Sequence, residues 1–430
     1  MSWCASAFKE RPNHFPVMKK LFSCFGLALL LDLQLLGVMR TVTVLPFANQ
    51  SGNRSVRWIG ESFPELLEDR LKWPGLNILG REERLVAFER MGIPYSSGLS
   101  KASLIKIGQE LDSTMLIWGD FTFDGSRLKV SASLVDLSKN TLSADLQEEG
   151  ELIDLQAMCS RLAWQILKSL DSSFALSREA FVSRFSVIPN IALENYVRGL
   201  LESDRSKQLH FFRQADRAYP NFDKAIFQLG KIYHQEKDYP TSSLWLQRLI
   251  RVNKDSSEAR FLLGLNHLFL KNYEKATLEF QELARVVPLS EVYSNLAVAL
   301  SLQGMTAEAT SAFQKALEGD PSGTDYLFNR AYHYWKAGNF AGAVRDLSEL
   351  LNRDTEDSEA HYLLYKCLQA LGKTSEANAS WSVAKQLDSR FELWETRRQI
   401  PDLFRIQSNF DETRLHRLQF EIQALQDGKS

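Results

Sequence analysis

The chain has 430 residues, which is enough for two to four domains with hydrophobic cores of their own. It carries 51 Lys and Arg against 53 Asp and Glu, a formal net charge of -2, so it is not built to neutralise a phosphate backbone and we expect no nucleic acid partner. Four cysteines lie far apart without a C-x-x-C motif, which argues against a zinc or redox site of that type.

The first 40 residues have the pattern of a leader. Lys19 and Lys20 precede an apolar run, Leu21–Leu31, whose eleven residues match the hydrophobic region of a signal peptide. Asp32 makes a membrane span over residues 21–39 marginal. Three interpretations stay open: a signal cleaved near residues 38–41, with Met18 as the start in place of Met1, an uncleaved anchor that associates with the membrane through residues 21–39, and a cytoplasmic or buried helix.

The next 130 residues predict alternating strands and helices and then a β-meander. In chain order we expect a strand at 41–45, helix 58–73, strand 76–81, helices 82–91 and 100–112, strands 113–123, 127–137 and 141–152, and helix 154–170. Asp124 and Gly125 form the expected hairpin turn. This order predicts an α/β domain with a small mixed sheet.

Several motifs in this region resemble one family. The segments "VLPFANQSGN", "LNILGR", "IGQELDSTMLIWGDFTFDGSRLKVSASLVD" and "DLQ" are similar, in order and spacing, to the TolB-like or FlgO-like domain that precedes tetratricopeptide repeats (TPRs) in many bacterial proteins. Trp118 and Asn140 depart from the usual pattern. The resemblance covers residues 41–172 and implies an envelope-associated or regulatory assembly module without known catalysis.

Two polar stretches of this region have simple structural interpretations. The loop Asn49–Arg54 lies between a strand and a helix, where anions often bind, but it has one Gly and no nucleotide-binding motif, so we expect a turn and a helix cap. The acidic run from Glu148 to Asp154 is expected to be a solvated strand end.

After a polar linker at 173–189, the sequence repeats. Small residues recur with spacings of 34, 33, 34 and 34 at Ser242, Ala276, Ala309, Ala343 and Ala377. Bulky residues follow four positions later, at Leu246, Phe280, Phe313, Leu347 and Trp381, and mostly small residues precede by twelve, at Gly230, Gly264, Ala297, Ala331 and Tyr365. This is the TPR pattern, and 190–388 has room for about six units of an all-α solenoid. Residues 389–430 are expected to form capping helices, the last with Leu415, Leu418, Ile422 and Leu425 on one face.

No residue pattern predicts chemistry in these repeats. The seven histidines are never within twenty residues of each other, and the chain has no G-x-S-x-G motif. We therefore assign no catalytic, metal-ligating or cofactor-binding residue.

The concave face of the predicted solenoid is the candidate binding surface. The first helix of each unit would place on it Phe227, Lys231, Phe261, Leu265, Val298, Phe328, Tyr332, Tyr362 and Lys366. Two interpretations stay open: packing between neighbouring helices, or an apolar peptide groove. Acidic residues beside these positions, at Glu258, Glu291, Asp325 and Glu359, would disfavour a ligand with a free carboxylate.

The sequence as a whole predicts a non-enzymatic scaffold that recruits a protein partner. We expect it to be exported, either periplasmic or anchored in the inner membrane and facing the periplasm. One alternative is a cytoplasmic regulatory module without its effector domain, and another is a hydrolase with an unrecognised site. The partner, the pathway and the oligomeric state stay open.

Overall fold

The computed structural model describes residues 39–93, 99–139, 141–142, 146–171 and 173–410. The apolar stretch at 21–39 and the helix predicted around Leu415 therefore lie outside the described residues, except for residue 39. Within the described ranges, no helix combines the length and the apolar character that a membrane span requires.

The first domain is built on a mixed sheet. Its strands are β1 (Arg40–Val44), β2 (Ala48–Asn49), β3 (Leu76–Leu79), β4 (Met115–Phe123), β5 (Arg127–Asp136), β6 (Thr141–Leu142) and β7 (Leu146–Glu151). β1 lies between β3 and β4 and is parallel to both, whereas β5 is antiparallel to β4, β6 and β7. The predicted mixed sheet is confirmed, but its last strand is two shorter pieces, β6 and β7.

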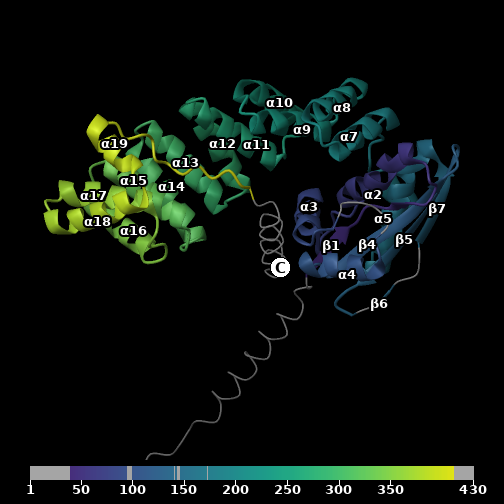
Figure 1. Cartoon of the computed structure of the whole chain (residues 1–430). Coiled ribbons are helices and arrows are strands. Elements are labelled where there is room, and N and C mark those ends of the chain that lie inside the picture. Colours follow the sequence, from purple (N-terminus) through teal and green to yellow (C-terminus); the bar gives the residue numbers. More distant parts are fainter. Residues whose placement is uncertain (1–38, 94–98, 140, 143–145, 172, 411–430) are drawn as a thin grey trace, which may run out of the picture.

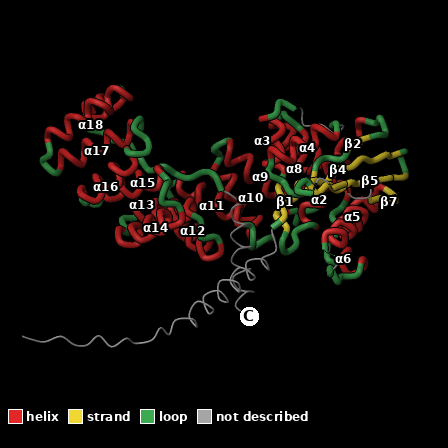
Figure 2. Tube along the Cα trace, turned by 90° about the horizontal axis from the view of Figure 1, so that it is seen from below, coloured by secondary structure: helices red, strands yellow, loops and turns green. Residues whose placement is uncertain are grey.

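Helices cover both faces of this sheet. They are α2 (Arg57–Arg70) and α5 (Leu155–Leu170) on one face, and α3 (Arg81–Arg90) and α4 (Lys101–Glu110) on the other (Figure 2). Side chains along a strand alternate between the faces. Met115 and Ile117 accordingly join the core under α2 and α5, while Leu116 packs with Phe88 and Ile107 of α3 and α4.

The two polar stretches behave differently from each other. The Asn49–Arg54 loop is a turn and a cap, as predicted, because Asn53 Oδ1 accepts the backbone N–H of Ser55 at the start of a 3-10 turn. The acidic run is not fully solvated. Glu148 is 9% exposed and its carboxylate lies 2.6 Å from Nε of Arg161 and 3.3 Å from Arg178, so this side chain is paired in the interior.

Residues 190–388 form six pairs of antiparallel helices, called units one to six. The pairs are α7 (Asn190–Leu201) with α8 (Arg205–Ala218), α9 (Asp223–Gln235) with α10 (Tyr239–Val252), α11 (Ser257–Phe269) with α12 (Tyr273–Val286), α13 (Ser290–Leu302) with α14 (Thr306–Gly319), α15 (Thr324–Lys336) with α16 (Phe340–Leu351), and α17 (Ser358–Ala370) with α18 (Thr374–Leu387). They follow one another in an arc away from the sheet (Figure 1). The predicted fold class, a small α/β domain followed by a TPR solenoid, is confirmed.

The small residues of the repeat let the two helices of a unit approach closely. Gly264 of α11 faces the ring of Phe280 on α12, and a Cβ at Gly264 would come within 2.7 Å of that ring. Phe280 is fully buried as a result. The 34-residue period therefore encodes the contact inside each pair.

The segment predicted to be a polar linker is packed. Residues 173–189 contain the short helix α6 (Arg178–Val182), and Phe174 and Phe181 are 4% and 1% exposed in the main core. Trp164 Nε1 of α5 donates to the carbonyl of Leu176 at 2.9 Å, and the N–H of Ile188 donates to the side chain of Gln156 at 3.1 Å. The segment is therefore not an exposed polar linker. Its apolar side chains occur in short groups, such as Phe174–Leu176 and Ala180–Val182, which show no clear period in the sequence. The domain boundaries themselves stay a prediction.

Units one and two share a core with the sheet domain. One continuous cluster of buried side chains runs from the sheet and α2 through α7 to α9. Tyr196 Oη of α7 donates to Glu65 of α2 at 3.0 Å, and Lys224 Nζ of α9 lies 2.6 Å from Asp69 of α2. The solenoid thus begins against the sheet domain.

Candidate functional site

The chain returns along its own solenoid after the last helix. α19 (Arg390–Arg397) packs beside unit six, and Arg398 then has a left-handed backbone with φ of 51°. Residues 399–410, called the tail below, contain no helix or strand. They run back from unit six towards unit three, opposite to the order of the repeats (yellow in Figure 1).

Capping helices were predicted for 389–430, and for the tail this was wrong. Pro401 has no backbone N–H to donate and would interrupt a helix that continued from α19. In addition, backbone groups that a helix would pair internally are bonded to the side chains of the solenoid. Residues 411–430 lie outside the described part of the chain.

Two asparagines hold the tail by its backbone. Asn329 of α15 accepts the N–H of Arg405 and donates to its carbonyl, both at 2.7 Å. Asn295 of α13 does the same for Gln407, at 2.9 and 2.8 Å. Both asparagines have no exposed surface, so these bonds satisfy amide groups that are shut off from water.

The Asn pair sits at equivalent places in units four and five. Asn295 and Asn329 are 34 residues apart, one repeat, and they bind residues two apart in the tail. In an extended chain the backbone groups of every second residue point to the same side. One repeat of the solenoid therefore corresponds to two residues of the bound segment.

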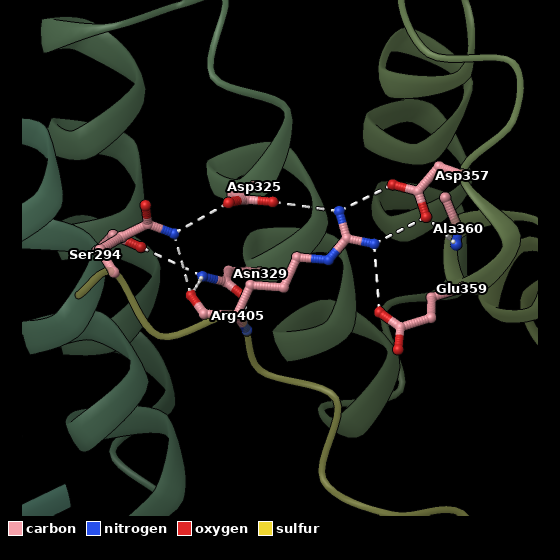
Figure 3. A network of polar contacts seen from close by, with 8 residues as sticks. Ser294, Asp325, Asn329, Asp357, Glu359, Ala360 and Arg405 are labelled. Atoms are coloured by element: carbon pink, nitrogen blue, oxygen red, sulfur yellow. Dashed lines mark hydrogen bonds and ion pairs between the residues drawn. The ribbon is translucent and has the colours of Figure 1, made fainter. Parts of the chain in front are cut away.

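The side chain of Arg405 enters an acidic pocket. Its two terminal nitrogens lie 2.8 and 2.7 Å from the two carboxylate oxygens of Asp357, which is a bidentate pair, and the guanidinium is also 3.2 Å from Asp325 and 3.3 Å from Glu359 (Figure 3). The central carbon of the guanidinium, Cζ, lies 3.7 Å from the ring centre of Phe328. Burial would lower the pKa of Arg405, but the bonds to Asp357 and the nearby carboxylates raise it above the ordinary value.

Apolar tail residues flank this arginine. Leu403 is 6% exposed, and the ring of Phe404 meets the ring of Tyr332 edge-on at 4.8 Å. Further along, the ring of Phe410 lies 5.0 Å from that of Phe261 in unit three. The tail thus combines backbone bonds, one buried cation and aromatic contacts.

The structure divides the predicted groove residues into three sets. The first set contacts the tail: Phe261, Phe328 and Tyr332. The second set, Leu265 and Val298, has no exposed surface and belongs to the core between the helices.

The third set lies at the two ends of the solenoid. Near the sheet domain, Lys231 pairs with Glu82 of α3 and its ammonium lies 5.7 Å from the ring centre of Phe227. At the far end, Tyr362 Oη and Lys366 Nζ both donate to Glu395 of α19, at 2.7 and 2.9 Å. Whether any of these residues binds a partner stays a prediction.

The Asn pair is not among the binding residues predicted from the sequence. A signal was present, because an amide recurs after one repeat at Asn295 and Asn329. Of the acidic residues that the sequence places beside the groove, Asp325 and Glu359 do contact the guanidinium of Arg405. Asp357 makes the shortest contacts to the guanidinium, but it lies just before α17, outside the helix positions from which the groove was predicted.

No cluster with the composition of a metal site occurs among the residues that the structure describes. The two described cysteines, Cys159 and Cys367, are buried, and burial raises the pKa of each thiol to about 12. A thiol with this pKa stays protonated near neutral pH and is a poor nucleophile.

Comparison with known proteins gives distant similarities. No protein-family model matches the chain. Over 244 residues, 55% of the chain, it is 22% identical to anaphase-promoting complex subunit 3 of Schizosaccharomyces pombe, and the match covers 35% of that protein. The chain thus spans about a third of the length of this curated relative.

Solved structures with similar folds have low identity. YrrB, described as a TPR protein with an unusual peptide-binding site, is 20% identical, and the match covers 41% of this chain and 91% of that one with a TM-score of 0.38. PilF of Pseudomonas aeruginosa is 14% identical, with coverages of 48% and 98% and a TM-score of 0.40. MamA of Desulfovibrio magneticus RS-1 is 16% identical, with coverages of 40% and 99% and a TM-score of 0.38. Similarity at this level assigns no function.

Proposed function

We propose that this protein is a non-enzymatic scaffold whose solenoid binds an extended segment of a protein partner along the concave surface of units three to six. The observation that carries the proposal is the Asn pair, because each amide exchanges two hydrogen bonds with the backbone of an extended segment. Such bonds give affinity for any extended chain, while pockets for alternate side chains give specificity.

The side-chain contacts indicate which segments fit. The carboxylates of Asp325, Asp357 and Glu359 favour an arginine, and Tyr332 favours an aromatic residue immediately before it. The same carboxylates oppose a ligand that ends in a free carboxylate at this place.

The location of the scaffold is a second part of the proposal. The leader pattern at 18–40 supports export to the bacterial envelope, and the motifs quoted for 41–172 support a TolB-like assembly module there. Fractionation of the native protein, with mass spectrometry of its N-terminus, tests this part. A mature chain that begins near residues 38–41 is expected, and an intact Met1 on a cytoplasmic protein would contradict it.

The binding proposal is tested with a labelled peptide that has the sequence of residues 399–410. The full chain with Phe404→Ala and Arg405→Ala, which weaken its own tail, should bind this peptide saturably in a fluorescence anisotropy titration. Addition of Asn295→Ala and Asn329→Ala removes four hydrogen bonds worth about 1 kcal/mol each, so the affinity should fall at least about tenfold.

The matched control is Asn378→Ala, which removes an exposed asparagine on α18. It should leave the affinity unchanged. The proposal is wrong if the peptide does not bind, or if loss of the groove asparagines changes its affinity no more than the control does.

A further inference from the structure

The groove already contains a segment with the properties that the proposed ligand needs. The tail fills the Asn pair, the acidic pocket and the aromatic contact at Tyr332 together. A second segment cannot use the same amides at the same time, because each Asn has both amide groups bonded to the tail. Any partner that binds there must first displace the tail.

We infer that the tail, residues 399–410, is an intramolecular competitive ligand that closes the groove. We also infer that the partner is a protein with an extended segment carrying an aromatic residue followed by arginine. This inference rests on the function proposed above. It adds a resting state in which the protein blocks its own binding surface, and it specifies the chemistry of the partner that opens it.

The linkage of the tail to the solenoid makes it an effective competitor. The tail continues directly from α19, which is fixed to unit six through the bonds of Glu395 to Tyr362 and Lys366. A ligand joined by a short connection acts at an effective concentration in the millimolar range. The apparent affinity for a partner is then reduced by the fraction of molecules whose groove is open.

The charges in the pocket explain how a partner segment could still displace the tail. Three carboxylates, of Asp325, Asp357 and Glu359, surround the single guanidinium of Arg405. These four groups leave an excess of negative charge that one arginine does not neutralise. A partner segment with an additional basic residue near its arginine would gain attraction that the tail lacks.

The exposed polar residues of the tail limit how tightly it binds to the solenoid. Ser408 and Asn409, between the Asn-bound residue Gln407 and the ring of Phe410, are exposed to solvent. The tail thus has firm contacts at residues 403–407 and one further contact at Phe410. Displacement can begin at this end without breaking the pocket contacts first.

The test compares the full wild-type chain with Arg405→Ala, using the labelled peptide of residues 399–410 as the probe. Arg405→Ala removes the bidentate pair and the contact with Phe328, and the groove itself is left intact. We expect the probe to bind this variant at least about tenfold more tightly than the wild type, because the groove is open in a larger fraction of molecules. The control is Arg397→Ala, an exposed arginine on α19, which should bind like the wild type.

Hydrogen exchange followed by mass spectrometry gives a second readout on the same chains. Peptides that cover residues 403–407 should be protected in the wild type, exchange quickly in Arg405→Ala, and lose protection in the wild type when the probe is in excess. Fast exchange of these residues in the wild type, together with equal probe affinity for both chains, would overturn the intramolecular inference and leave the proposed function standing.

Two other outcomes are informative. If residues 403–407 exchange quickly in Arg405→Ala and this variant still does not bind the probe, the proposed function fails and the inference fails with it. If sedimentation shows a wild-type dimer that Arg405→Ala dissociates, the tail occupies the groove of a second copy, which overturns the intramolecular assignment.

A probe with its arginine replaced by glutamate should bind at least about tenfold more weakly to Arg405→Ala if the partner chemistry is right.

Discussion

Two buried asparagines fix the register of an extended segment. Asn295 and Asn329 each need one N–H and one carbonyl from the same residue of the tail, and Arg405 and Gln407 supply them. A slip by one residue would turn the backbone groups of the tail to the opposite side, as it does in a strand. The slip would also remove Arg405 from its three carboxylates, so backbone and side-chain contacts select the same register.

At the same scale, the close contact within unit three predicts the effect of one methyl group. Gly264→Ala places a Cβ within 2.7 Å of the Phe280 ring, and both residues are packed between helices. Overpacking of this kind destabilises proteins by about 1–3 kcal/mol. We expect the free energy of unfolding to fall by that amount, which a lower urea midpoint would reveal. Ala297 holds the equivalent place in unit four, which therefore accommodates a methyl group at this position. An unchanged urea midpoint would show that the helices of unit three can also shift to accommodate one.

The buried thiols predict slow chemical labelling. Burial raises the pKa of Cys159 and of Cys367 to about 12, so the reactive thiolate is scarce at pH 8. Maleimide labelling, followed by peptide mass spectrometry, should modify neither residue in the native protein and both in urea. Rapid native labelling of Cys367 would mean that unit six opens readily, since that thiol lies in α17.

Among the elements, the segment 173–189 has a role that its composition did not reveal. Phe181→Ala removes a ring that is 1% exposed and contacts Phe174 and Phe185, so we expect a loss of about 3–5 kcal/mol in the free energy of unfolding. Limited proteolysis should leave this segment intact in the wild type and cut it in the variant. Val187→Ala, in the same segment but 75% exposed, should behave like the wild type. Early cleavage of the wild type between 173 and 189 would contradict the packing described here.

The elements also show how far sequence patterns reach. The helix pairs could be predicted because the period of 34 specifies small residues against bulky ones, as Gly264 against Phe280. The tail could not be predicted, since residues 399–410 have no period and their bonds join residues 76 and 112 positions apart. The Asn pair was visible as a repeat, but a mid-helix asparagine does not reveal its partner. The sequence therefore predicts which face of the solenoid forms the groove, but it does not predict which segment binds there.

Across the whole molecule, the sheet domain and the first units are expected to unfold together. Their common core runs from the sheet to α9, whereas units five and six belong to a separate cluster of buried side chains. Helical repeats interact mainly with their nearest neighbours, so a local change should spread to the next unit and fade beyond it. A substitution at the junction should thus loosen the sheet and unit two and leave the far units unchanged.

Lys224→Met is the substitution that tests this coupling. It removes an ammonium that lies 2.6 Å from Asp69 and 3.7 Å from Glu65, whose carboxylate also accepts the Tyr196 hydroxyl. Hydrogen exchange should become faster in β1, β4 and α7 to α9, and stay unchanged in α15 to α18. Arg353→Met, which breaks an exposed pair with Glu349 in unit five, is the control and should leave the sheet unchanged.

The same ion pair predicts how the difference between wild type and Lys224→Met depends on pH. Burial would lower the pKa of Lys224, but Asp69 and Glu65 raise it above 10.5, so its contribution is fully present below 10.5 and is lost as pH rises through the folded value. Desolvation would raise the pKa of Asp69, but Lys224 and other cations lower it below 3.8, so that contribution is present above 3.8 and is lost as pH falls through the folded value. The melting temperatures of the wild type and Lys224→Met should therefore differ most between about pH 4 and pH 10. A difference in melting temperature that is as large at pH 2 as at pH 7 would show that Lys224 stabilises the junction by packing and not by charge.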